Sequence, residues 1–329
     1  MNQPRVAVFG ASGFVGSHAV QALQARGAVV IRLAAPRLES IRAIDVVDFV
    51  RGSAELRAQV RASLGGAVAV VNAAGIPDAS SGNEPQLMAA NAACAAILSA
   101  AARDHDVKRF VHVSSAVVQG DIATLDETTV VRPFSAYSRS KALGESMVAD
   151  FGPIETVIYR PPSVHGADRR VTRMIHRFAR TPLSMTVAPG DTPSPQALIQ
   201  NVADAVAYLA LSPTAPPPVV IHPWEGITTA GLLRVLGRRE PRLLHPAVAR
   251  IVLRMLKSAS LGLPRIEANR RRLELLWLGQ PQALSWLSRV GWKAPVGPDG
   301  WDKLFDEVMA ATRVCQVVHM GATGRDPGE

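Results

Sequence analysis

The sequence predicts an α/β protein built on a doubly wound parallel sheet, with a smaller and mostly helical C-terminal lobe. Short β-branched runs alternate along the first half with alanine-rich stretches that are long enough for helices, which is typical of βαβ units. The apolar residues of these runs are consecutive, as in strands that helices cover on both faces. With 48% hydrophobic and 19% charged residues among 329, the chain can bury a large core, and a largely disordered protein is excluded.

The expected elements follow in chain order. We expect strands at Arg5–Phe9, Val29–Leu33, Ala67–Asn72, Phe110–Ser114 and Thr156–Arg160. The stretches between them predict helices at Gly16–Arg26, Pro85–Asp104 and Ser138–Asp150. After Arg160 prolines interrupt the pattern, and only a helix at Val202–Leu211 and an edge strand at Val219–His222 are legible. The prediction is therefore a first domain at residues 1–165, to which 196–222 return, and a substrate-binding lobe at 166–195 and 223–329.

Composition excludes several classes of protein. Two cysteines, Cys94 and Cys315, are too few for a disulfide framework or a four-cysteine zinc site, and the eight histidines lack metal-ligand spacing. The N-terminus lacks the pattern of a signal peptide. The longest uncharged run, Gln86–Ala102, is shorter than the ~20 residues of a membrane span. We therefore expect a cytoplasmic protein that binds no metal and no membrane.

The net charge of +9 is unevenly distributed. Residues 1–150 hold 14 Lys and Arg against 13 Asp and Glu, whereas residues 151–329 hold 22 against 14. Because guanidinium groups bind phosphate oxygens in pairs, an arginine excess in one half favours a small phosphate-bearing ligand over nucleic acid. A solvated, arginine-biased surface is the alternative.

A glycine loop follows the first expected strand and precedes the first expected helix. In GASGFVG, Gly10 permits a tight turn, Gly13 lets the backbone approach a pyrophosphate, and Gly16 lets the helix pack against the strand. Ser12, Phe14 and Val15 complete the loop, whose helix N-terminus would face the phosphates. This context predicts a Rossmann-type NAD(P)-binding domain at residues 1–165.

The end of the second expected strand bears on the choice of cofactor. A site that prefers NAD carries an acidic residue there for the ribose hydroxyls, but no carboxylate appears before Glu39. Arg32 and Arg37 could instead hold a 2′-phosphate, so the sequence favours NADP over NAD. Asp48, taken to lie at a third strand, is a candidate contact for the adenine.

Tyr137 and Lys141 stand four residues apart, on one face of an expected helix. A nearby cation favours the phenolate of a tyrosine and lowers its pKa of about 10, which suits a proton-transfer group. Ser115 lies at the carboxyl end of a strand, where ligands bind in open α/β sheets, and could hold the substrate oxygen.

These motifs together resemble those of the extended short-chain dehydrogenases/reductases, a family that includes nucleotide-sugar epimerases, dehydratases and ketoreductases. The matching segments are GASGFVG at 10–16, NAAG at 72–75, Asn91, VSSAVVQG at 113–120, YSRSK at 137–141 with Glu145, RPPSVHG at 160–166 and, more weakly, NVADAV at 201–206. The match covers the first two thirds of the chain, in the family's order.

The resemblance implies roles for several positions. Ser115, Tyr137 and Lys141 would form the catalytic triad, and Asn91 would help to position it. The further residues implied at the cofactor are Ala73, Ala74, Gly75, Pro161, Ser163 and Val164. The resemblance also implies a homodimer through a four-helix bundle made by the helices of 86–104 and 138–150, although a buried alanine-rich helix would look similar.

Departures from the family's pattern narrow the reaction. Ala116 and Val117 replace the Asp-Glu pair of the family's dehydratases, which argues against that reaction. Gln119 replaces a tyrosine near the substrate, His165 stands at the expected mouth of the pocket, and Arg173 is a further candidate contact. A lone histidine is more often a packing residue. Likewise, the four tryptophans between 277 and 301 fit core packing better than stacking on a substrate.

The leading hypothesis is an NAD(P)-dependent oxidoreductase or epimerase with a nucleotide-sugar-like substrate. The alternative within the enzyme class is an NADPH-dependent reductase of a hydrophobic ketone, such as a steroid- or flavonoid-like compound. A cofactor-sensing regulator without catalysis is the alternative from another class, but such relatives usually lack the tyrosine or the lysine.

Overall fold

A six-stranded, all-parallel sheet forms the centre of the protein. The computed structural model describes residues 3–78, 81–153, 155–259 and 264–322. The strands are β1 (Arg5–Phe9), β2 (Val29–Leu33), β3 (Ala69–Asn72), β4 (Arg109–Val113), β5 (Glu155–Arg160) and β9 (Val219–Ile221). Their order across the sheet is β2-β1-β3-β4-β5-β9, and every neighbouring pair is parallel. The order reverses direction between β1 and β3, which is the switch point of a Rossmann-type sheet, so the predicted fold class is confirmed.

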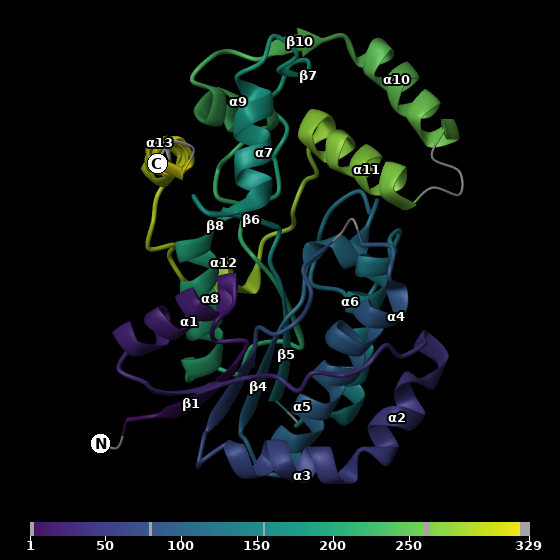
Figure 1. The fold of residues 1–329 in the computed structure, drawn as a ribbon, viewed down its shortest axis with the longest axis vertical. Coiled ribbons are helices and arrows are strands. Elements are labelled where there is room, and N and C mark those ends of the chain that lie inside the picture. Colours follow the sequence, from purple (N-terminus) through teal and green to yellow (C-terminus); the bar gives the residue numbers. More distant parts are fainter. Residues whose placement is uncertain (1–2, 79–80, 154, 260–263, 323–329) are drawn as a thin grey trace, which may run out of the picture.

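Two helices cover one face of the sheet (Figure 1). They are α1 (Phe14–Ala25) and α8 (Ile199–Leu211), which pack against each other. Val6 and Val8 of β1 point to this side, as do Val111 and Val113 of β4. The residues between them point to the other side, because side chains alternate along a strand. Apolar residues lie on both sides of β1, β3, β4 and β5, which explains the consecutive apolar runs in the sequence.

The opposite face carries the larger helical layer. It consists of α2 (Val46–Gly52), α3 (Ala54–Ser63), α4 (Glu84–Met88), a π-helical segment (Ala89–Ala93), α5 (Cys94–Arg103) and α6 (Ala136–Phe151). The helical stretch Glu84–Arg103 is long and apolar enough to cross a membrane, but 83% of its most apolar window is buried in the protein. Its alanines allow α5 to lie between α3 and α6 in the core.

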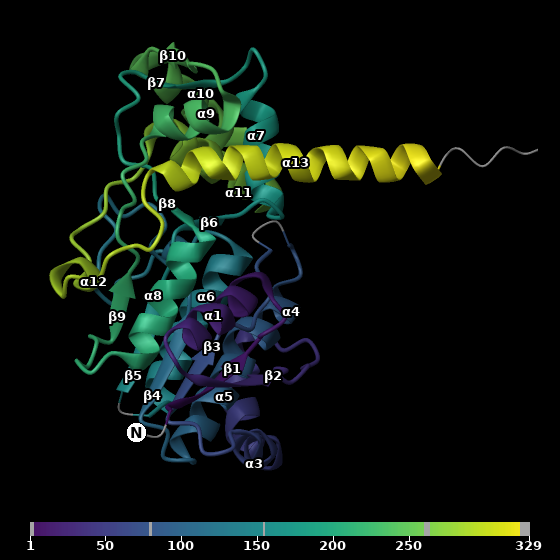
Figure 2. The same cartoon turned by 90° about the vertical axis from the view of Figure 1, so that its left-hand side faces the viewer.

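The second lobe lies beyond the carboxyl ends of the strands (Figure 1). Its helices are α7 (Arg170–Ala179), α9 (Thr229–Gly237), α10 (Pro246–Ala259), α11 (Pro264–Leu278) and α13 (Asp299–Ala322). Two short sheets accompany them, β7 (Met185–Val187) with β10 (Arg242–Leu244), and β6 (Ser163–His165) with β8 (Gln196–Leu198). Helix α13 extends sideways, past the body of the molecule (Figure 2).

One segment of the expected substrate lobe packs instead on the sheet domain. Helix α12 (Trp286–Arg289) contributes Trp286 and Leu287 to the apolar cluster that α1 and α8 form with the sheet. The backbone at 281–283 also pairs with Leu125, which donates to Pro281 and accepts from Ala283. Residues 281–289 therefore depart from the predicted division of 223–329, because the chain crosses back to cover β9 before it enters α13.

Candidate active site

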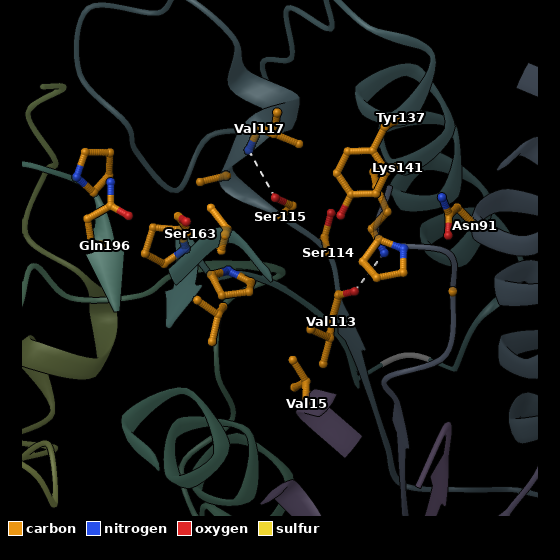
Figure 3. A pocket seen from close by; sticks show the side chains of 18 of the residues that line it. Val15, Asn91, Val113, Ser114, Ser115, Val117, Tyr137, Lys141, Ser163 and Gln196 are labelled. Carbon is orange, nitrogen blue, oxygen red and sulfur yellow. Dashed lines mark hydrogen bonds between the residues drawn. The ribbon is translucent and has the colours of Figure 1, made fainter. Parts of the chain in front are cut away.

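A cavity of about 420 Å³ lies at the carboxyl ends of the strands, between the sheet and the second lobe. Predicted site residues from six separate stretches of the sequence line it, and Figure 3 shows several of them around the cavity. The predicted residues among its walls are Gly13, Phe14, Val15, Ala73, Ala74, Gly75, Asn91, Ser115, Tyr137, Lys141, Pro161, Ser163 and Val164. The fold thus brings most of the predicted cofactor and catalytic positions into one pocket.

The glycine loop is shaped by two close backbone approaches. Gly10 has φ of +76°, and a Cβ there would lie 2.7 Å from the backbone nitrogen of Ala74. A Cβ on Gly16 would collide with the carbonyl oxygen of Gly10. Gly10 and Gly16 therefore form the turn itself and lie behind the pocket, while the exposed Ser12 lies outside its walls.

The N-terminus of α1 fits a dinucleotide. Gly13 is its N-cap, and within the described part of the chain no side-chain cap bonds to the free amides of the first turn. Such amides bind phosphate oxygens well, since they add the positive end of the helix dipole to several N–H donors. Gly13, Phe14 and Val15 face the cavity at this point. The loop and the helix end therefore have the shape and the donors that a pyrophosphate requires.

Asn91 joins the loop after β3 to the helix that carries Tyr137. Its Oδ1 accepts from the Ile76 amide at 2.9 Å, and its Nδ2 donates to the Ile76 carbonyl at 3.2 Å and to Ser140 Oγ at 2.9 Å. Asn91 lies in the π-helical segment, a type of irregularity that is frequent at functional sites. It thus holds Ala73–Gly75 against α6, as a positioning residue would.

Tyr137 lies in the first turn of α6, which Ser135 and Ser138 cap reciprocally. Its ring reaches over the pocket, and its hydroxyl points toward the loop after β4 (Figure 3). Burial raises the pKa of the Tyr137 phenol, while a hydrogen bond from Ser115 and the positive charge of Arg169 act in the opposite direction. The fold therefore brings Ser115 and Tyr137 into contact.

Lys141 is buried one helical turn further along α6. Its Nζ donates to the Val113 carbonyl at 2.8 Å and lies 3.5 Å from His112 Nε2. Burial lowers the pKa of Lys141 to about 8, against the attraction of Glu145. The lysine faces the cavity next to Tyr137, but the cation that acts on the pKa of Tyr137 in this structure is Arg169.

Sequence reasoning missed Arg169 as a pocket residue. It stands just before α7, and its guanidinium lies 4.7 Å from the centre of the Phe14 ring. Its Nε is buried and has no hydrogen-bond partner among the residues that the structure describes. The motif RPPSVHG is followed two residues later by an arginine pair, which was the available signal, whereas the predicted candidate was Arg173, one turn further along α7.

Helix α11 closes the pocket from the second lobe with Arg271, Arg272 and Leu275. Arg271 is almost fully buried, bonds to the Gly120 carbonyl and to Gln280, and pairs with Glu274 at 3.0 Å. Its guanidinium is thus already engaged in fixing the loop after β4. Arg271 is therefore not a free candidate among the arginines of residues 151–329 for the expected phosphate-bearing ligand.

Three further predicted cofactor contacts, besides those of the glycine loop, lie outside the pocket walls. Arg32 and Arg37 are exposed at and after the end of β2. Asp48 lies on α2, exposed, so its assignment to a third strand is wrong. The β-branched run around it forms a helix because only Val46 and Val50, four residues apart, are buried.

The three predicted substrate residues also lie elsewhere. Gln119 is fully buried, with its amide bonded to Asp126 at 2.8 Å, so it supports a loop. His165 is fully buried against Trp301, with a ring nitrogen 2.6 Å from Gln196 Oε1. Arg173 is a partly exposed residue of α7 outside the pocket. A motif identifies the segment of chain that lies near the cavity. The alternation of side chains along a strand, or the turn of a helix, decides which residues of that segment face it.

Comparisons with known proteins agree with this architecture. Residues 6–210 match the model of the NAD dependent epimerase/dehydratase family. A curated protein of Stigmatella aurantiaca, 4-hydroxy-2-methyl-3-oxo-4-farnesyl-3,4-dihydroquinoline-1-oxide ketoreductase, is 32% identical over 176 residues. The match takes in 50% of this chain and 51% of that protein, so the chain spans about half the length of this relative.

Solved structures share the fold at low sequence identity. MoeE5 in complex with UDP-glucose and NAD has a TM-score of 0.63 at 18% identity, over 94% of this chain and 99% of that one. UDP-glucuronic acid 4-epimerase from Bacillus cereus, in complex with NAD, gives 0.62 at 18%, over 93% and 99%. The dTDP-4-dehydrorhamnose reductase from Bacillus anthracis str. Ames, in complex with NADP, gives 0.55 at 17%, over 74% and 85%.

Proposed function

Since the chain belongs to the NAD-dependent epimerase/dehydratase family, we propose that it is an NAD(P)-dependent enzyme that interconverts a carbonyl and a hydroxyl group. The observation that carries this proposal is the meeting of Ser115 and Tyr137 in the cavity that also holds the uncapped N-terminus of α1. A proton-transfer group and a phosphate-binding helix end are thereby placed in one pocket.

The chain's own residues supply binding, orientation and the proton. Gly13, Phe14 and Val15 would hold the pyrophosphate, while Pro161 and Val164 would pack against the nicotinamide, which gives or takes the hydride when the cofactor is bound. Ser115 donates a hydrogen bond to the substrate oxygen, and Tyr137 gives that oxygen a proton in reduction or removes it in oxidation. Lys141 would bind the nicotinamide ribose from beneath the tyrosine.

For the substrate, we favour a largely apolar ketone. Beyond Ser115 and Tyr137, five apolar side chains line the cavity beside its arginines and glutamines, and these are Val117, Leu125, Phe134, Val171 and Leu275. The relative from Stigmatella aurantiaca is named for the reduction of a farnesylated quinoline ketone, which also supports an apolar substrate. This was the alternative to the nucleotide-sugar hypothesis from the sequence.

A nucleotide-sugar epimerase is the second candidate, and one observation favours it. Arg169 and Arg272 line the same cavity, and guanidinium groups are suited to a diphosphate. In this reaction Tyr137 would remove the proton and later return it, and the cofactor would stay bound between the two halves. Either reaction uses the same pair of Ser115 and Tyr137.

A homodimer also stays a prediction, and residues 94–102 of α5 are already buried within the single chain.

Two measurements test the proposal. Purified protein is first denatured, and any released nucleotide is identified by mass spectrometry. Retained NAD supports the epimerase, whereas an empty protein that binds NADPH more tightly than NADH supports the ketoreductase.

The second measurement is turnover of apolar ketones by Tyr137→Phe, with Tyr208→Phe, outside the pocket, as the matched control. We expect turnover to fall by at least about a hundredfold in Tyr137→Phe, the scale of general acid catalysis, while cofactor affinity stays within a few-fold. Unchanged turnover in Tyr137→Phe would remove the proposed proton donor.

A further inference from the structure

His112 is a fully buried histidine on β4 that the proposed chemistry does not use. Its ring lies between two polar groups of neighbouring elements. On one side Asn72, at the end of β3, places Nδ2 3.1 Å from His112 Nδ1. On the other side Nε2 lies 3.5 Å from Lys141 Nζ. The histidine thus connects the strand before the glycine-containing loop 73–75 with the buried lysine of the pocket.

The hydrogen bonds around Asn72 fix the tautomer of this ring. The Ala74 amide donates to Asn72 Oδ1 at 3.0 Å, so the oxygen of the side-chain amide must face Ala74 and its nitrogen must face His112. His112 Nδ1 therefore accepts, and a neutral ring carries its proton on Nε2. Burial and the charge of Lys141 both lower the pKa of His112 well below its ordinary value, so the ring stays neutral.

The Nε2 proton then points toward the Lys141 amine. A ring nitrogen that carries a proton cannot accept a hydrogen bond from an ammonium group. Among the described residues, the Val113 carbonyl is the oxygen that accepts from Lys141 Nζ. The other positions on Nζ are consequently directed away from β4, to the side of the cavity that Lys141 lines.

We propose that His112, held by Asn72 as its Nε2–H tautomer, is a positioning residue that directs the Lys141 amine into the pocket and disfavours its protonation. The proposal rests on the proposed function, in which Lys141 binds the nicotinamide ribose. The proposal goes beyond that function because it assigns a positioning role to His112, a residue of β4 behind the pocket.

Other charged groups near Lys141 also influence its protonation equilibrium, on which we propose that His112 acts. Glu145, on the next turn of α6, raises the pKa of Lys141, but its carboxylate is shared with Arg160 of β5 and with Ser114. On the cavity side lie Tyr137 and, beyond it, Arg169. Burial outweighs the attraction of Glu145, so the pKa of Lys141 is lowered to about 8.

Nuclear magnetic resonance tests the proposal without substrate or cofactor. In wild-type protein labelled with ¹⁵N-histidine, two-bond ¹H–¹⁵N correlations report the tautomer, and we expect the Nε2–H pattern for His112 throughout the stable pH range. The Nδ1–H pattern or an imidazolium would overturn the proposal. This readout needs no variant of His112, so it stands even where a substitution disturbs folding.

The second readout is the titration of Lys141. The chain has only five lysines, so ¹³C-labelled lysine side chains can be resolved, and Lys141→Met assigns the signal. His112→Asn keeps an acceptor for Asn72 but has no atom at the Nε2 position. We expect the midpoint of Lys141 to rise by roughly half a pH unit or more in this variant. His105→Asn, on a loop away from the pocket, is the matched control and should leave the midpoint unchanged.

An unmoved midpoint in His112→Asn, or an equal shift in the control, would contradict the proposal. Failure of the proposed function has a different signature, because it appears as undiminished turnover in Tyr137→Phe and leaves both readouts of His112 as they are.

Discussion

The guanidinium of Arg169 lies over the Phe14 ring, with its carbon 4.7 Å from the ring centre. Phe14 belongs to the glycine loop, and the charge of Arg169 also acts on Tyr137. One arginine from the start of the second lobe is thus in contact with the cofactor loop and within electrostatic reach of the proton-transfer group. A cation over an aromatic face stabilises such a contact by about 0.5–2 kcal/mol.

This relationship predicts a shift in the ionisation of Tyr137. Because the positive charge of Arg169 lowers the pKa of the phenol, Arg169→Met should raise that pKa further. The acidic limb of kcat/KM for alcohol oxidation should therefore move to higher pH. Arg173→Met, on the first turns of α7 but outside the pocket, serves as the control. Identical pH profiles for the two variants would show that Arg169 does not act on the phenol.

Lys141 should reduce stability at neutral pH. Its pKa is about 8 in the folded protein and about 10.4 when unfolded, so the unfolded state binds more protons between these values. The contribution of Lys141 to the free energy of unfolding therefore rises as the pH increases from about 8 to about 10.4. Below about pH 8 the buried lysine lowers this free energy by the full amount, about 3 kcal/mol.

Lys141→Met should therefore raise the free energy of unfolding at about pH 7 by about 1–3 kcal/mol, since loss of the bond to Val113 offsets part of the gain. Urea denaturation of both proteins at about pH 7 and pH 9.5 measures the difference, which should shrink at the higher pH. If the two proteins differ by the same free energy of unfolding at both pH values, the pKa of Lys141 is not lowered in the folded protein.

His165 should make the protein sensitive to acid. Burial is the main cause that lowers the pKa of His165 to about 4, and the charge of Arg169 adds to it. The unfolded histidine titrates near 6.5, so stability falls as the pH drops from about 6.5 to about 4, by at most about 3 kcal/mol. His165→Gln should flatten this dependence in thermal denaturation. A wild-type curve that is already flat over this range would contradict the assignment.

The exposed arginines at and after the end of β2 lead to a prediction about the preference for NADPH over NADH. If Arg32 and Arg37 hold a 2′-phosphate, the double variant Arg32→Ala, Arg37→Ala should lose at least about tenfold in affinity for NADPH, because each charge-assisted bond contributes about 1.5–3 kcal/mol. Affinity for NADH should be nearly unchanged. Arg51→Ala on α2 is the control, and fluorescence titration with both nucleotides measures the change. Equal losses for both nucleotides would exclude a contact to the 2′-phosphate.

Local patterns determined much of the fold and the centre of the site. The strand followed by GASGFVG specifies its own turn, because Gly10 and Gly16 have no room for a Cβ where the loop folds back. The four-residue spacing of Tyr137 and Lys141 places both on one side of α6, which a helix dictates without help from the rest of the chain. These features depend on neighbours along the sequence, so a single sequence is sufficient to predict them.

The tertiary structure alone decided which distant side chains reach the pocket. Arg169 and Leu275 line it because the second lobe folds over the strand ends, and no sequence spacing connects them with Ser115. Asp48 lies on a helix instead of a strand because a hydrophobic layer formed by α2, α3 and α5 covers this side of the sheet. His112 acquires its tautomer only from Asn72, forty residues away on the neighbouring strand. The pattern of the sequence determines the geometry of residues that are neighbours along the chain. Packing between distant elements determines which polar groups come into contact.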